Sequence, residues 1–237
     1  MTKQICSFFA FFIIVTSSCL FSQEKPKESD SKEYKEAYEL LFDSQKRAKR
    51  ALDLLTESGT KALADLPDQE LLLTYYAYNE LYIPEKQLEV AKLLFERNPK
   101  SSSATSCMCN SLHFKLDSPE GIKEVEKFVE DTMKKGLGNR RSLLLLKANV
   151  VLVKPDLPDG KKRVEVTDLL VEAYVADPVA KDEINFSIGE PTNFIVEEYP
   201  FVSFFSQSER RAIQERMLKA KKEKDESEKE AGKVDAP

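Results

Sequence analysis

The chain of 237 residues contains no Trp, a single His and only seven Gly. One His excludes a metal site built on several histidines and leaves a single residue for any His-based catalysis. So few glycines disfavour β-sandwiches and barrels, whose many turns require them, and they exclude a Gly-rich phosphate-binding loop. We therefore expect a fold that is poor in tight turns.

Basic side chains are also fewer than acidic ones. The 36 Lys and Arg side chains are outnumbered by 41 Asp and Glu, which gives a net charge of -5. Proteins dedicated to nucleic acids usually carry a basic excess. We expect no nucleic-acid partner.

Residues 1–22 have the pattern of an export signal. Lys3 precedes an apolar run from Ile5 to Val15, and small polar residues follow that run. This order is typical of a secretory signal peptide, and the run is shorter than the ~20 residues that span a bilayer. The protein is expected to be exported, to a periplasmic or a secreted location.

An uncleaved membrane anchor is the alternative to export, and for an exported chain two ways of processing this signal remain open. Cleavage after Ser22 would release the chain without an anchor. Alternatively, Ser18–Cys19 resembles the end of a bacterial lipoprotein signal, although Thr16 stands where that pattern prefers Leu. In that case Cys19 would carry a lipid, which would be the chain's contact with a membrane, and the protein would be a lipid-anchored subunit of an envelope complex.

Only two cysteines are expected in the mature fold. Cys6 leaves with the signal and Cys19 is either removed or acylated, so Cys107 and Cys109 remain. Two cysteines do not make a disulfide scaffold in a chain of this length. Its core must be held together by burial of apolar side chains.

A long amphipathic helix is predicted after a flexible polar linker at 23–32. Its apolar stripe recurs at helical spacing and comprises Tyr34, Tyr38, Leu41, Ala48, Leu52 and Leu55. Ser58–Gly59 should end this helix, because Gly readily adopts the left-handed conformation found at helix C-termini.

Further helix signals follow along the chain. Asp68 can cap a helix that reaches about Tyr82, and Pro84 suits the first turn of the next helix, which stops near Asn98–Pro99. Ser118–Pro119 repeats the start signal, and Gly136 provides a stop. Two more helices are expected at 141–153 and about 162–176, separated by a loop at 154–160. No segment alternates with period two, so the predicted fold is all-α.

Apolar positions recur with a period of ~34 residues, a length typical of repeated helix pairs. In the first helices these sets are Tyr75, Tyr78 and Tyr82, then Cys109, Leu112 and Leu116, then Leu143, Leu146 and Val150. The same step relates the second helices at 84–98 and 119–135, whereas the following step needs 41 residues because of the loop at 154–160. Such a period indicates stacked helix pairs, each with an apolar face too wide to bury alone. A plain helical bundle with a coincidental period is the alternative.

A helix pair with this repeat period resembles the tetratricopeptide-repeat (TPR) family over about residues 68–176. Tyr78 falls on the Tyr of the family's first helix and Pro99 on its closing Pro, whereas the family's Trp is missing. The resemblance implies an all-α, TPR-like helical-repeat solenoid of about three helix pairs, with an N-terminal helix and a C-terminal capping segment. The implied layout is a repeat domain at 33–178, a capping segment at 179–218 and a disordered charged tail at 219–237.

The first helices of TPR-like stacks line a groove that binds peptides. By resemblance, the groove positions in this chain are Tyr76, Asn79, Asn110, His113, Arg140 and Lys147. Asn79, His113 and Lys147 are again separated by one repeat period each, so we expect them along one wall. The implied function is non-catalytic binding of a protein or peptide without a cofactor. A solvated helix face with no ligand is the alternative.

Cys107, Cys109 and His113 invite a metal-site interpretation. On a helix Cys109 and His113 share a face, whereas Cys107 lies ~200° around from Cys109. Two ligands are fewer than a closed zinc site needs. We expect small thiols packed between helices, with an enzyme or metal carrier using Cys109 and His113 as the remaining alternative.

Aromatic side chains are concentrated between residues 179 and 207. They are Phe186, Phe194, Tyr199, Phe201, Phe204 and Phe205. A hydrophobic plug over the last repeat is expected, and an exposed docking patch is the alternative. The exposure of Phe204 and Phe205 distinguishes the two. A polar helix from about Glu209 to Ala220 should follow and pass into the charged tail.

Overall fold

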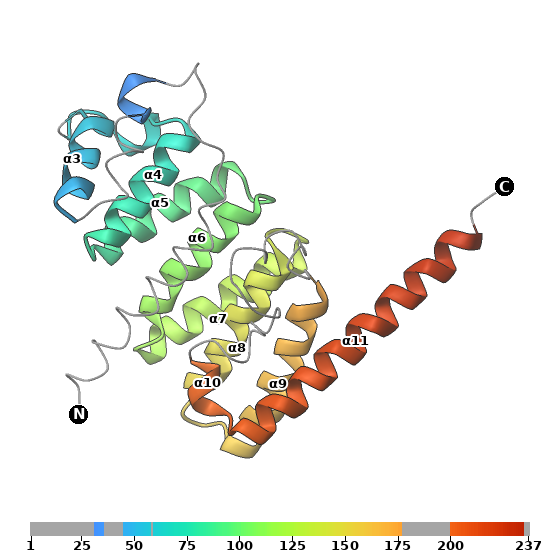
Figure 1. Cartoon of the computed structure of the whole chain (residues 1–237). Coiled ribbons are helices and arrows are strands. Elements are labelled where there is room, and N and C mark those ends of the chain that lie inside the picture. Colours follow the sequence, from blue (N-terminus) through green and yellow to red (C-terminus); the bar gives the residue numbers. More distant parts are fainter. Residues whose placement is uncertain (1–30, 36–44, 58, 177–199, 235–237) are drawn as a thin grey trace.

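The computed structural model describes residues 31–35, 45–57, 59–176 and 200–234, and this part of the chain is all-helical (Figure 1). The predicted fold class, all-α, is therefore confirmed at this level. The predicted signal peptide, Cys19 and most of the linker lie outside the described residues. None of the helices within the described ranges is long and apolar enough to cross a membrane.

The helices follow one another in the order that the sequence indicates. A single helical turn at 32–35 precedes elements whose bounds are α3 Gln45–Leu55, η1 Leu63–Asp65, α4 Asp68–Glu80, α5 Pro84–Arg97, α6 Ser102–Leu112, η2 His113–Lys115, α7 Pro119–Lys134, α8 Arg140–Val153, α9 Asp159–Ala176, α10 Phe201–Phe204 and α11 Gln207–Val234. We call α4–α5, α6–α7 and α8–α9 the first, second and third helix pairs by their order in the chain, although α6 packs on α5 and α8 rather than on α7.

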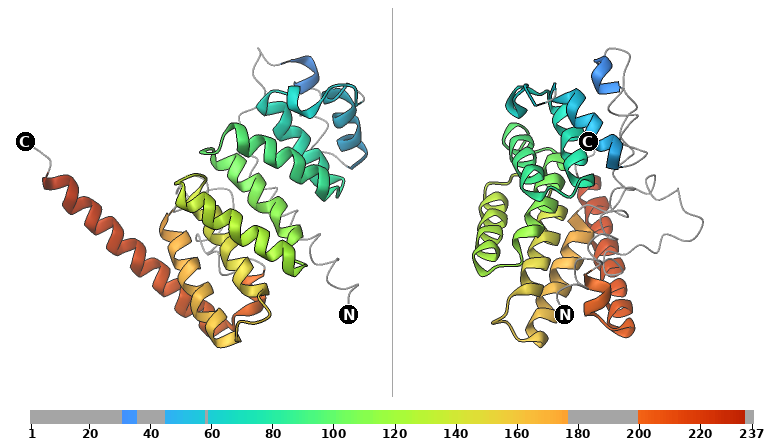
Figure 2. Two further views of the ribbon diagram at one scale, coloured as in Figure 1. Left: turned by 180° about the vertical axis from the view of Figure 1, so that it is seen from behind. Right: turned by 90° about the vertical axis from the view of Figure 1, so that its left-hand side faces the viewer.

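Neighbours in the chain are mostly neighbours in space. Helix α4 lies against α5, α5 against α6, α7 against α8 and α8 against α9, while α6 also touches α8 (Figures 1 and 2). At the two ends of this series α3 packs on α4 and α11 packs on α9. Helix α11 then continues away from the body of the molecule.

Short polar side chains and prolines begin several helices where expected. Pro84 stands in the first turn of α5, and Ser118 caps α7 by accepting a hydrogen bond from Gly121 N at 3.1 Å. Asn139 caps α8 in the same way, through Ser142 N at 3.0 Å. Such caps satisfy backbone donors that have no partner within the helix.

Asp68 is not the cap that the sequence suggested. It is the first residue of α4, Pro67 precedes it, and no side chain caps this helix. Its carboxylate instead accepts hydrogen bonds from Arg97 at 3.1 Å and Asn98 at 2.5 Å, both at the end of α5. Arg97 also donates to Leu66 O at 2.7 Å. Asp68 thus ties the start of α4 to the end of α5.

Two helix boundaries differ from the prediction by a few residues. Helix α3 ends at Leu55, because Glu57 already has φ 48°, and Gly59 follows with φ 87°. Residues 36–44, which should join 34 and 55 in one helix, lie outside the described residues. Helix α9 begins at Asp159 rather than near 162. The stop at Gly136, with φ 63°, is as predicted.

The repeat period marks buried positions. Of the nine first-helix positions, seven are buried: Tyr75, Cys109, Leu112, Leu116, Leu143, Leu146 and Val150. Tyr78 is half-buried, and Tyr82 is 52% exposed. Tyr82 differs because it lies beyond the end of α4 with φ 56°, so it no longer continues the helix face.

Helix α8 joins two hydrophobic clusters. Leu143 and Leu146 face the cluster formed with α4 to α7. Leu144 and Ala148 face a second cluster with α9, α10 and α11, which includes Phe201. Burial on both sides explains why the sequence of α8 is so apolar.

The C-terminal segment covers the third helix pair. Phe201 and Phe205 are buried and Phe204 is half-buried, so these three rings form a plug and not an exposed patch. Phe186, Phe194 and Tyr199 lie outside the described residues. The polar helix extends to Val234, so residues 219–234 are helical where we expected a disordered tail.

Candidate functional site

A surface hollow of about 430 Å³ lies on the third helix pair. Lys147 of α8 forms one side. The rest is lined by α9 residues, namely Gly160, Lys161, Val164, Glu165, Asp168, Leu169 and Glu172. We call this feature the α8–α9 hollow.

The spacing of the α9 residues explains why they line one surface. Lys161, Glu165, Asp168 and Glu172 follow each other at steps of 4, 3 and 4 residues, which places them on one helix face. Gly160 adds no side chain to fill the space. On its other side α9 buries apolar residues in the second cluster.

An apolar side chain remains exposed in this polar surrounding. Val164 is 64% exposed, although it lies between charged residues on the outer face of α9. Leu169, which also lines the hollow, is 7% exposed. The hollow therefore offers apolar surface flanked by charged groups, a combination common at binding sites.

Most acidic groups of the hollow already have basic partners. Asp168 accepts from Arg216 of α11 at 2.8 Å, and Glu172 forms an ion pair with Arg140 of α8. The pKa of Lys154 is raised chiefly by its hydrogen bond to Glu126, and Glu165 adds to this through its charge. Lys154 and Glu165 therefore interact electrostatically, although Lys154 forms its hydrogen bond with Glu126.

The two lysines of the hollow differ from Asp168 and Glu172 because their ammonium groups have no charged partner among the residues described. Across the described ranges, neither the Lys147 nor the Lys161 ammonium group has a hydrogen-bond or ion-pair partner. Lys147 is half-buried and Lys161 is exposed.

Arg140 and Lys147, two of the predicted groove residues, come together at this hollow. They lie seven residues apart on α8, Arg140 pairs with Glu172, and Lys147 lines the hollow with that same glutamate. The residues that sequence reasoning missed are those of α9. Their 4-3-4 spacing around an exposed Val164 was the available signal.

The groove residues on α4 serve contacts within the first helix pair. Asn79 accepts a hydrogen bond from the buried Gln87 of α5 at 2.9 Å. Tyr76 is half-buried and packs edge-on against Tyr75, with ring centroids 5.4 Å apart. Asn79 and Lys147 therefore each face the second helix of their own pair, α5 and α9 respectively.

Asn110 and His113 lie at the end of the second pair's first helix. Asn110 is exposed, whereas His113 is half-buried where α6 passes into η2. Loss of hydration lowers the pKa of His113 to about 4. The imidazole is therefore uncharged at neutral pH.

Cys107 and Cys109 are buried free thiols. Burial raises the pKa of Cys107 to about 12 and raises that of Cys109 as well. Thiols held protonated in this way are poor nucleophiles and poor metal ligands. Among the described residues no group of three or more His, Cys, Asp or Glu side chains is placed to hold a metal.

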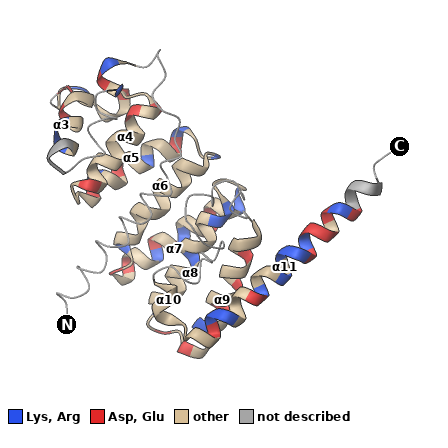
Figure 3. Cartoon of the chain, in the orientation of Figure 1, with Lys and Arg blue, Asp and Glu red and all other residues tan. Residues whose placement is uncertain are grey.

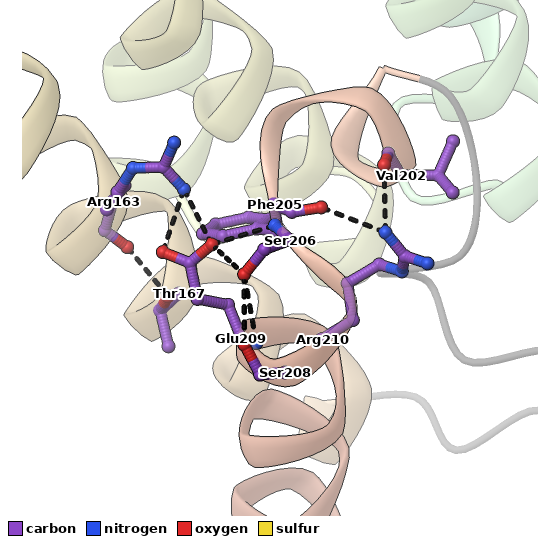
Figure 4. Close-up of polar contacts among 8 residues, drawn as sticks. All are labelled: Arg163, Thr167, Val202, Phe205, Ser206, Ser208, Glu209 and Arg210. Carbon is purple, nitrogen blue, oxygen red and sulfur yellow. Dashed lines mark hydrogen bonds and ion pairs between the residues drawn. The ribbon is translucent and has the colours of Figure 1, made fainter.

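A polar contact network fixes α11 beside the hollow (Figure 4). Arg163 of α9 donates to both carboxylate oxygens of Glu209, at 2.8 and 2.9 Å, and its guanidinium lies 4.7 Å from the centroid of the Phe204 ring. Glu209 in turn accepts from the backbone and hydroxyl of Ser206 at 2.7 and 2.6 Å. These bonds lower the pKa of Glu209, the Ser206 hydroxyl contributing most. The network holds α11 where Arg216 reaches Asp168.

Comparison with known proteins found no significant match. No protein-family model matches the chain, and no curated protein and no solved structure matches it significantly.

Proposed function

We propose that the chain is an exported, TPR-like helical-repeat protein that binds another protein or peptide on its helical surface without covalent chemistry. The α8–α9 hollow, with an exposed Val164 beside two unpartnered lysines, is the observation that carries this proposal. Exposed apolar surface next to charged groups is typical of a recognition site.

The repeated burial pattern supports the repeat part of the proposal. Positions one repeat period apart, such as Cys109 and Leu143 or Leu112 and Leu146, are buried in the same hydrophobic cluster. Each helix pair buries its apolar face against the next pair, as stacked repeats do. A stack of this kind presents long helix surfaces to a partner.

The third helix pair is the best-supported place for binding. Its outer surface carries the hollow, and α11 borders it through the Arg216–Asp168 ion pair. The groove residues on α4 are by contrast engaged within their own pair, as the Asn79–Gln87 hydrogen bond illustrates. We therefore place the partner on α8–α9 and not along the predicted wall of Asn79, His113 and Lys147.

A pair of matched variants tests this placement. Val164→Asp puts a carboxylate into the hollow, and Phe114→Asp makes the same kind of change at an apolar side chain, 40% exposed, on the second pair. Affinity capture with the full chain from its native compartment should lose its partner with Val164→Asp and keep it with Phe114→Asp. Capture that survives Val164→Asp and disappears with Phe114→Asp would move the site away from the third pair.

A further inference from the structure

Among the charged side chains that line the α8–α9 hollow, Lys147, Lys161 and Glu165 have no ion-pair partner within the described ranges, so the unpaired charge is net positive. Asp168 is paired with Arg216 and Glu172 with Arg140, whereas Lys147 and Lys161 have no partner among the residues described. A ligand that brings carboxylates would give both ammonium groups charge-assisted hydrogen bonds. A basic ligand would find only Glu165 unpaired and would have to compete with Arg140 and Arg216 for the other two acids.

The register of α8 against α9 gives the separation of the two lysines. Lys162 donates to Leu152 O at 2.9 Å, and Arg140 pairs with Glu172 at the opposite end, so the helices run antiparallel. In this register Lys147 lies level with a point about five residues beyond Lys161 on α9. At ~1.5 Å rise per residue, the two lysines are displaced by about 7.5 Å along the helix axis.

That displacement suits an extended chain. Alternate residues of an extended segment lie ~6.6 Å apart and project to the same side. The two helix axes add a lateral separation of ~8–10 Å. The flexible four-carbon stems of the lysines can bridge it, so two acidic side chains at positions i and i+2 can reach Lys147 and Lys161 together. An apolar side chain at position i−2 or i+4 projects to the same side as the two acids and can cover Val164, which is 64% exposed.

We propose that the α8–α9 hollow binds an extended acidic segment of a partner protein, with carboxylates two residues apart held by Lys147 and Lys161 and apolar side chains packed on Val164. This inference rests on the proposed function and specifies the chemistry of the partner. Lys147 and Lys161 determine the specificity, while Val164 supplies non-polar contact.

Fluorescence anisotropy with a defined probe tests the proposal. The probe is a fluorescein-labelled peptide with Glu at positions i and i+2 and Leu at i+4, all on one side of an extended chain, and its matched control replaces each Glu by Gln. The full chain should bind the acidic peptide, and the amide peptide about tenfold or more weakly. The combined variant Lys147→Gln and Lys161→Gln should lose that preference. Lys127→Gln, at an exposed lysine on α7, should keep it.

Several results would overturn this inference, and the Val164→Asp capture experiment shows whether the proposed function falls with it. Equal binding of the acidic and amide peptides, or no binding of either, contradicts acidic recognition. If Val164→Asp still abolishes capture, the hollow remains a binding site for another chemistry. If capture survives, the proposed placement fails as well.

A second copy of the chain is the competing occupant. The end of α11 carries exposed acids, Asp225, Glu226, Glu228 and Glu230. If sedimentation shows self-association that disappears both on truncation after Lys224 and in the combined lysine variant, the occupant is this helix of another copy. That result would overturn the assignment to a different protein.

Discussion

At the scale of single residues, burial decides which side chains keep their ordinary chemistry. His113 has a pKa near 4 because its half-buried position disfavours the charged imidazolium. Cys107 and Cys109 are protonated for the same reason. Lys147 and Lys161 border the open hollow instead. The residues available for recognition are therefore the lysines, and not the thiols or the imidazole.

His113 should make the protein sensitive to moderate acid. Its folded-state pKa of about 4 lies below the ~6.5 of an unfolded chain, so the unfolded state takes up the proton first as pH falls. Stability present above pH ~6.5 is then lost progressively down to pH ~4. Between pH 7.5 and 5 the loss from this residue should be about 2 kcal/mol.

Urea unfolding at these two pH values measures the effect. His113→Gln, which cannot be protonated, should lose about 2 kcal/mol less than the native chain over the same interval. An unchanged pH dependence in this variant would show that His113 is not the group responsible.

The two buried thiols should resist alkylation in the folded protein. With their pKa values raised by burial, they contain very little thiolate at pH 8. Iodoacetamide followed by peptide mass mapping should leave Cys107 and Cys109 unmodified in buffer and label both in urea. Rapid labelling in buffer would mean that α6 opens easily or that the thiols are accessible.

At the scale of elements, local sequence signals predict several helix boundaries correctly. Pro84 and Ser118 begin α5 and α7 through local rules, since a fixed backbone angle or a side-chain cap acts within one turn. Asp68 was assigned a similar role but pairs with Arg97, 29 residues away, which no local pattern reveals. Long-range ion pairs of this kind compete with local capping.

Helix α11 exceeded its predicted length for a local reason. Oppositely charged side chains four residues apart face each other along it, as in Lys219–Glu223, Lys222–Glu226 and Lys224–Glu228, each at 3.8 Å. Lys and Glu are also good helix formers, so a charged composition does not imply disorder. Figure 3 shows the two signs interspersed along this helix.

Packing of α11 on the third pair should depend on its few apolar residues. Met217 is fully buried and Leu218 is 52% exposed. Met217→Ala should lower the free energy of unfolding by about 2–4 kcal/mol, because it leaves a cavity, whereas Leu218→Ala should change it by less than ~0.5 kcal/mol. Chemical denaturation of both variants gives the comparison. Similar effects at the two positions would contradict the packing of α11.

The Arg163–Glu209 contact should add a smaller, pH-dependent contribution. Arg163→Ala removes a two-point ion pair and the contact with Phe204, which together are worth about 1 kcal/mol at a half-exposed site. Because the pKa of Glu209 is lowered in the fold, its share is present at neutral pH and lost as pH falls through that value. A double-mutant cycle with Glu209→Gln should show coupling at pH 7 that declines as the pH is lowered through the depressed pKa of Glu209.

At the scale of the whole molecule, the sequence predicted the fold class and the order of helices more fully than the candidate site. The repeat period selected buried positions such as Leu112 and Leu146 because burial repeats with the helix pairs. The site combines Lys147 on α8 with Val164 on α9 and is bordered by Arg216 of α11. Which helix surfaces lie next to one another here depends on how α11 packs on α9. The spacing of residues in the sequence does not reveal that packing.

Site-specific photocrosslinking tests the central claim, partner binding at the α8–α9 hollow, most directly. A photoreactive phenylalanine analogue is placed at Val164 in the full chain, and in a matched protein at Lys127 on α7, which is also exposed. Irradiation in the native compartment should give one discrete adduct from position 164 and none from position 127, and Lys147→Gln should reduce that adduct. Adducts of equal yield from both positions, or none from position 164, would contradict binding at the hollow.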